Sequence, residues 1–130
     1  GEPLDLGRID CPAYFVATRE DHIVPWQTSF LGRRLLSGES VFVLGASGHV
    51  AGVINPAAKN KRSYWANELP AATADEWLEG AVEHRGSWWP HWIDWLKSRS
   101  GELVAAPAKV GNRQYKELEP APGRYVKERS

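Results

Sequence analysis

Short apolar segments alternate with charged ones in the first half of the chain. Residues 14–17 (YFVA) are rich in aromatic and β-branched side chains and lie between Pro12 and a charged stretch. Such a run predicts a strand that is buried on both faces. Residues 18–22 predict a charged loop, and residues 41–44 (VFVL) predict a second strand that leads into a glycine-punctuated turn at 45–49.

A helical pattern joins these two strands. Pro25 suits a first helical turn, because the N–H group that proline lacks would have no partner there. Gly38 is typical of the position after a last turn. Between them, apolar residues recur at helical spacing, at Phe30, Leu31, Leu35 and Leu36. The order strand, helix, strand predicts the α/β class, with a parallel sheet and a right-handed crossover.

The second half carries helix signals and a polar connection over residues 55–62. Thr73 and Glu76 have the capping-box spacing, which predicts a helix that continues to about residue 84. Residues 87–98 predict a tryptophan-rich helix, mostly buried through two apolar stripes that leave three polar residues for solvent. The stripes are Trp88, Trp92, Trp95 and Trp89, Ile93, Leu96, and the polar residues are His91, Asp94 and Lys97.

Composition limits the classes of function. The 130 residues hold 16 Lys+Arg and 16 Asp+Glu, so a net charge of zero argues against nucleic-acid binding and a polybasic membrane anchor. The most apolar window, residues 41–54, is shorter than the roughly 20 residues of a spanning helix. No signal-peptide pattern is visible, so we expect a cytoplasmic protein. The chain starts at Gly1 and has no Met, which predicts a piece of a longer or processed polypeptide.

Two polar residues follow the two predicted strands. Asp21 comes just after the first strand and His49 just after the second. Because the carboxyl ends of neighbouring parallel strands share one edge of an open α/β sheet, we expect Asp21 to lie near His49. A carboxylate that orients an imidazole is the acid–base half of a catalytic triad. The alternative is that Asp21 caps the following helix and His49 is an ordinary loop histidine.

A triad also needs a nucleophile. Cys11 precedes its strand, whereas a nucleophile elbow follows one, and Pro12 has no N–H group for an oxyanion hole. We therefore interpret Cys11 as a structural or idle thiol. Ser47 departs from the G-x-S-x-G pattern, because His49 stands in place of the last glycine. The remaining candidate is a residue outside this chain.

The other histidines give only a weak metal signal. His84 and His91 are seven residues apart with Pro90 between them, and no His-x-x-x-His pattern occurs. We interpret them as surface or capping histidines and expect no metal site. The tryptophan-rich helix also has two interpretations. It is either part of the core or an aromatic wall beside an acyl or polymer path.

Four segments resemble the C-terminal end of class I polyhydroxyalkanoate synthases, and the resemblance covers essentially the whole chain. In order they are residues 19–26 (REDHIVPW), 42–56 (FVLGASGHVAGVINP), 86–90 (GSWWP) and 119–127 (EPAPGRYVK).

The resemblance implies the C-terminal portion of an α/β-hydrolase fold over residues 1–100, with its last parallel strands and helices, and an extended tail over residues 101–130. It implies a Cys-His-Asp triad in which Asp21 is the acid and His49 the general base, and in which either His49 or Asp21 activates the 3-hydroxyl group for chain elongation. Such enzymes polymerise (R)-3-hydroxyacyl-CoA into polyester and release CoA, which belongs to the substrate, so no cofactor is expected. The family's Cys lies in an upstream G-x-C-x-G elbow, so this chain should not polymerise alone. The full-length form is expected to be a homodimer on cytoplasmic polyester granules.

Two other functions fit the same residues. A related α/β-hydrolase, such as a thioesterase or depolymerase, would use the same acid–base pair with water as the acceptor. A module without catalysis would instead use the tryptophan-rich helix to bind a polyester granule.

Overall fold

The computed structural model describes residues 3–129, which divide into two compact units at residue 100. The first unit contains every strand and α-helix of the described residues. In the second unit, residues 101–129, most side chains are exposed, and the sole helical element described there is a 3₁₀ turn at Tyr125–Lys127. An ion pair of 3.2 Å between Arg124 Nε and Glu119 Oε2 precedes this turn.

A four-stranded sheet in the order β1, β2, β3, β4 forms the centre of the first unit. β1 and β2 are parallel, β3 is antiparallel to β2, and β4 is antiparallel to β3. The sheet is therefore mixed, and the expected parallel arrangement holds for the first pair alone. The strands are β1 (Ala13–Thr18), β2 (Ser40–Gly45), β3 (Ser63–Ala66) and β4 (Val82–Arg85).

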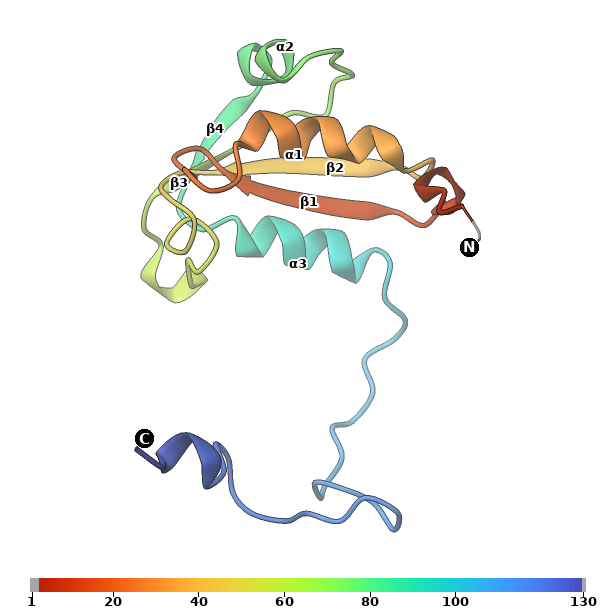
Figure 1. The fold of residues 1–130 in the computed structure, drawn as a ribbon, viewed down its shortest axis with the longest axis vertical. Helices are drawn as coiled ribbons and strands as arrows, with labels where there is room; N and C mark the ends of the chain where they lie inside the picture. Colours follow the sequence, from red (N-terminus) through yellow and green to blue (C-terminus); the bar gives the residue numbers. More distant parts are fainter. Residues whose placement is uncertain (1–2, 130) are drawn as a thin grey trace. The chain divides into compact units, whose positions relative to one another are not determined.

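Helices lie on both faces of this sheet (Figure 1). α1 (Trp26–Gly32) connects β1 to β2 and lies over one face, and α3 (Trp89–Lys97) lies over the other. Short 3₁₀ turns occupy Leu6–Arg8, Arg33–Leu35 and Ala57–Lys59. The predicted strand–helix–strand unit is thus present, with each strand one residue longer at both ends than its apolar run. The helix is shorter than predicted, because α1 ends at Gly32 and a 3₁₀ turn follows to Leu35.

An aromatic core fills the space on the α1 side. Phe30 of α1 meets Phe42 of β2 edge to face, with ring centroids 5.3 Å apart. Trp77 of α2 (Ala74–Glu79) meets Phe42 in the same way at 4.9 Å. Phe30 and Trp77 are 0% and 2% exposed. Burial of such large rings is a principal source of stability for so short a sheet.

The helix predicted from Thr73 to residue 84 is shorter than expected. Its capping box is present, because Thr73 Oγ1 accepts from Glu76 N and the Glu76 carboxylate accepts from Thr73 N. However, α2 ends at Glu79, and β4 pairs with β3 from residue 82 onward. The four residues of β4 are all exposed, so no apolar alternation marked this edge strand.

α3 differs from the buried helix that its stripes predicted. None of its residues is fully buried, and Trp92 and Ile93 are 38% and 41% exposed. His91, expected in solvent, is part-buried instead, and its Nδ1 lies 2.8 Å from the hydroxyl of Tyr14 on β1. The helix therefore packs on the sheet through a narrow strip, and the apolar side chains beside that strip stay accessible.

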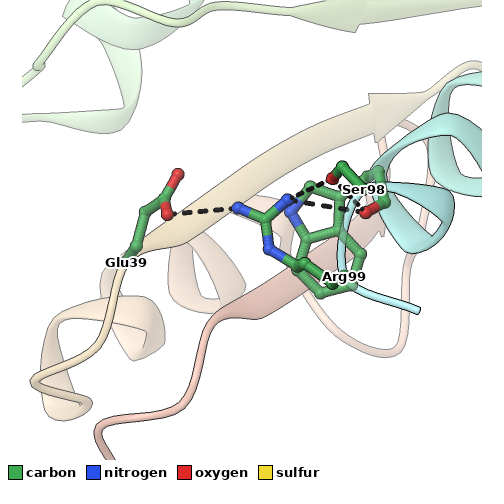
Figure 2. Close-up of polar contacts among 4 residues, drawn as sticks. Glu39, Ser98 and Arg99 are labelled. Atoms are coloured by element: carbon green, nitrogen blue, oxygen red, sulfur yellow. Dashed lines mark hydrogen bonds and ion pairs between the residues drawn. The ribbon is translucent and has the colours of Figure 1, made fainter. Parts of the chain in front are cut away.

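Ionic and aromatic contacts hold the far end of α3. Arg99 lies just beyond the helix and contacts Glu39, the residue before β2, with 3.1 Å between Nη2 and Oε2 (Figure 2). Its other terminal nitrogen donates to Ser98 Oγ at 2.9 Å, and its guanidinium lies 4.6 Å from the centre of the Trp95 ring. These contacts attach the C-terminal end of α3 to the start of β2.

Candidate active site

Asp21 and His49 lie together at one edge of the sheet. Asp21 follows β1 and His49 follows β2, and these strands are parallel, so both loops leave the same end. Asp21 Oδ2 lies 2.8 Å from His49 Nδ1. The contact that the sequence predicted between these side chains is therefore present in the structure.

The carboxylate of Asp21 is held by its own loop as well as by the histidine. Its Oδ1 accepts hydrogen bonds from the backbone N–H groups of Ile23, at 2.9 Å, and Val24, at 3.0 Å. The Val24 bond, followed by the His49 bond, lowers the pKa of Asp21 to about 2. The group is thus ionised at neutral pH, and both of its oxygens are occupied.

This ionised carboxylate determines how the imidazole is protonated. A carboxylate accepts hydrogen bonds but has no proton to donate, so His49 Nδ1 must carry the proton of the 2.8 Å contact. The neutral ring then has its lone pair on Nε2. The side chain of His49 is 47% exposed, whereas that of Asp21 is 10% exposed. The pair therefore presents an oriented proton acceptor at the surface, supported by a shielded negative charge.

A pocket of about 210 Å³ adjoins the pair. Asp21 and His49 both line it, and Val16, Val24 and Val53 supply apolar walls. A larger cavity of about 720 Å³ lies between the start of β2 and the end of α3, but neither Asp21 nor His49 lines it. The Asp21–His49 pair is thus located at the smaller pocket.

The two nucleophile candidates within the chain do not join this site. Cys11 is exposed and precedes β1, so a strand of about 17 Å separates it from the Asp21 end. Ser47 lies in the turn after β2 with a φ of 81°, and within residues 3–129 its hydroxyl makes no hydrogen bond with His49.

The remaining histidines belong to the sheet and α3. His84 lies on β4, not on the predicted helix, and stacks on Tyr64 with ring centroids 5.0 Å apart. His91 lies against Tyr14 and Tyr64, where burial and then the nearby His84 lower its pKa. In the described part of the chain, no group of three His, Cys, Asp or Glu side chains has a metal-binding arrangement.

Comparison with known proteins decides the family. The chain is 56% identical over 127 residues to the poly(3-hydroxyalkanoate) polymerase subunit PhaC of Cupriavidus necator, which covers 98% of the chain. It is 44% identical over 130 residues to PhaC of Rhizobium etli and 40% identical over 129 residues to poly(3-hydroxyalkanoate) polymerase 1 of Ectopseudomonas oleovorans. The chain belongs to the poly(3-hydroxyalkanoate) polymerase family. No protein-family model matches it.

The match covers a limited part of these polymerases. The chain spans 22%, 20% and 23% of the three relatives, respectively. It corresponds to their C-terminal part. Among the described helices, none combines the length and the apolar character needed to cross a membrane.

Sequence reasoning missed three residues of this polymerase segment that touch the His49 loop. Ser87, Trp88 and Trp89 belong to the GSWWP motif, and the sequence pattern predicts a core helix there without a polar role for them. Each donates a side-chain hydrogen bond to a backbone carbonyl between residues 52 and 55. A signal was present, because a buried indole N–H requires an acceptor, but the sequence does not show which one.

Proposed function

We propose that this chain supplies the acid and the general base of a Cys-His-Asp triad in a polyhydroxyalkanoate synthase, which polymerises (R)-3-hydroxyacyl-CoA. The observation that carries the proposal is the 2.8 Å contact of Asp21 with His49 Nδ1, which leaves Nε2 available. Membership of the poly(3-hydroxyalkanoate) polymerase family supports the substrate class. The cysteine belongs to the part of the enzyme that precedes this segment.

Acyl transfer proceeds through two proton movements at Nε2. His49 takes the proton of the cysteine thiol, and the thiolate attacks the thioester carbonyl. As the carbon–sulfur bond to CoA breaks, the imidazolium returns the proton to the CoA sulfur. The negative charge of Asp21 stabilises the imidazolium between these steps.

The same base serves chain elongation. His49 takes the proton of the 3-hydroxyl group, and the oxygen attacks the acyl–cysteine thioester. As the carbon–sulfur bond breaks, the imidazolium returns the proton to the cysteine sulfur. Asp21 is poorly suited to take that proton, because both of its oxygens are occupied and its pKa is about 2. These observations support His49 as the base for both half-reactions.

The fold and surroundings are consistent with this assignment. A parallel β1–α1–β2 unit with an acid and a histidine after its two strands fits the end of an α/β-hydrolase domain. The apolar lining of the adjoining pocket suits an acyl chain. We further propose that the segment alone is inactive, and that the full-length enzyme acts as a homodimer at cytoplasmic polyester granules.

CoA release from (R)-3-hydroxybutyryl-CoA by the full-length enzyme tests the proposal. His49→Gln should lower turnover by about 10³-fold or more, because it removes the base that forms the thiolate. Asp21→Asn should also lower it strongly, because the amide N–H would direct the Nδ1 lone pair toward residue 21 and place the proton on Nε2. His22→Gln is the matched control, since His22 is exposed and adjacent to Asp21.

The products of the same assay separate polymerisation from hydrolysis. A synthase yields polyester with the released CoA, whereas a thioesterase yields free 3-hydroxy acid. Full turnover by the His49→Gln enzyme would remove His49 from the mechanism. Free acid as the main product would identify water as the acceptor.

A further inference from the structure

Backbone hydrogen bonds within residues 48–55 shape the loop that carries His49, but these bonds do not attach it to the rest of the fold. His49 is followed by a tight turn, in which Gly52 N donates to Gly48 O at 2.9 Å and Ile54 N donates to Val50 O at 2.8 Å. Among the described residues, Asp21 is the one hydrogen-bond partner of the imidazole, which is 47% exposed. The position of Nε2 therefore depends on how the backbone of this loop is fixed to the rest of the fold.

Three consecutive residues at the start of α3 bind the backbone of this loop. Trp88 Nε1 donates to Gly52 O at 3.1 Å, and Trp89 Nε1 donates to Val53 O at 3.0 Å. The hydroxyl of Ser87 donates to Asn55 O, and its oxygen also accepts from Trp89 N at 3.1 Å. The loop is thus held at three carbonyls within seven residues of His49.

Burial makes two of these hydrogen bonds costly to lose, the one from Ser87 to Asn55 O and the one from Trp88 to Gly52 O. Ser87 is 5% exposed, Trp88 is 8% exposed and Asn55 is 4% exposed. A buried carbonyl group is stable away from water only while a donor binds it. Removal of either donor would therefore favour displacement of the loop. Asn55 extends the same arrangement, because its Nδ2 donates to Lys61 O at 2.9 Å.

The segment that makes these bonds is itself attached to the sheet. Trp88 stacks on Tyr14 of β1, with ring centroids 6.2 Å apart, and His91 lies 2.8 Å from the Tyr14 hydroxyl. At the other end of α3, Arg99 contacts Glu39 beside β2. α3 thus connects the His49 loop to β1 and β2, the strands that lead to Asp21 and His49.

We propose that Ser87, Trp88 and Trp89 are positioning residues that hold the His49 loop, so that Nε2 stays in register with the reacting thiol and hydroxyl groups. The inference rests on the proposed function of His49 and assigns a role to three residues whose side chains bond the backbone of its loop, not the imidazole. Displacement of a catalytic group by about 1 Å costs on the order of 10²-fold in rate, so small shifts of this loop are sufficient.

Single tryptophan replacements in the full-length enzyme test the proposal. Trp88→Phe and Trp89→Phe each remove one indole N–H and retain an aromatic ring. Each should lower kcat for CoA release by about tenfold or more with little change in KM, because the thioester contacts are retained. Trp92→Phe is the matched control on the same helix, since the Trp92 indole makes no hydrogen bond within the described residues.

A spectroscopic measurement gives a readout independent of turnover. The Nδ1–H proton shared by His49 and Asp21 should give a far-downfield resonance that shifts or broadens in Trp88→Phe and stays unchanged in Trp92→Phe. If kcat and this resonance in Trp88→Phe match those of Trp92→Phe, the proposal is wrong. If Trp88→Phe does not fold, Trp89→Phe decides by the same criteria, because Trp89 is less buried.

Failure of the proposed function would give results that differ from failure of this inference. Full turnover of His49→Gln would overturn the role of His49 in catalysis, while the resonance would still report whether Trp88 and Trp89 hold its loop. An inactive His49→Gln enzyme together with unaffected Trp88→Phe and Trp89→Phe enzymes would overturn this inference alone.

Discussion

The methyl group of Thr18 occupies the space that a side chain at residue 52 would need. A Cβ atom at Gly52 would overlap Thr18 Cγ2 and lie 2.9 Å from the carbonyl oxygen of Ala46. Thr18, at the end of β1, is 1% exposed. The loop after β2 therefore lies directly against the end of β1, which brings His49 toward the loop of Asp21.

This contact predicts that Gly52→Ala displaces the His49 loop. Overpacking of a closed site costs about 1–3 kcal/mol, so we expect a lower melting temperature and slower CoA release in the full-length enzyme. Gly32→Ala is the control, because a Cβ there would meet nothing within 4 Å. Equal behaviour of the two variants would show that the close approach at Gly52 is unimportant.

Acid stability should depend on Asp21. The pKa of this carboxyl is lowered from its ordinary value of 3.8 to about 2 by hydrogen bonds from Val24, His49 and Ile23. A lowered folded-state pKa stabilises the fold above pH 4, and this contribution disappears as the pH falls toward 2. We expect the melting temperatures of wild type and Asp21→Asn to converge over that interval. A difference independent of pH would contradict the assignment.

The contact of Tyr14 with His91 should confine α3 docking to a middle range of pH. Burial, then the nearby His84, lowers the pKa of His91 from 6.5, although Glu68 and Asp94 oppose the shift. His91 therefore binds a proton more readily in the unfolded chain than in the folded one, so the fold loses stability as the pH falls below 6.5. Burial, and then the charge of Tyr64, raises the pKa of Tyr14 from 10.0, so stability also falls above pH 10.

Two variants separate these effects. His91→Gln should remove the acid-side loss, and Tyr14→Phe should remove the alkaline-side loss. The measurement is the melting temperature of the full-length enzyme relative to wild type at each pH, with hydrogen exchange of the α3 amides as the local probe. Parallel pH curves for wild type and both variants would show that neither side chain contributes.

Loss of the helix cap should loosen α2 without disturbing the site. Thr73→Ala removes the acceptor of Glu76 N and should cost about 1 kcal/mol. Faster hydrogen exchange of the α2 amides in the full-length enzyme would report this change, while CoA release should stay near wild type. Thr73→Ser keeps the acceptor and serves as the control. Unchanged exchange in Thr73→Ala would mean that packing of Trp77 alone holds this helix.

The sequence alone was sufficient for the unit that contains Asp21 and His49. Continuous apolar runs marked β1 and β2, and Pro25 and the spacing around Phe30 marked the intervening helix, because these signals depend on neighbours in the chain. The contact between the two side chains followed from topology, since parallel strands leave their carboxyl ends at one edge of the sheet.

Only the tertiary structure determined the second half. β4 has no buried residue, and β3 is half-buried throughout, so their pairing arises from backbone hydrogen bonds that leave no apolar pattern. The hydrogen bond of Trp88 to the His49 loop also depends on the tertiary structure. An indole N–H shows in the sequence that it needs an acceptor, but the choice of Gly52 O, 36 residues away, depends on where the chain folds back.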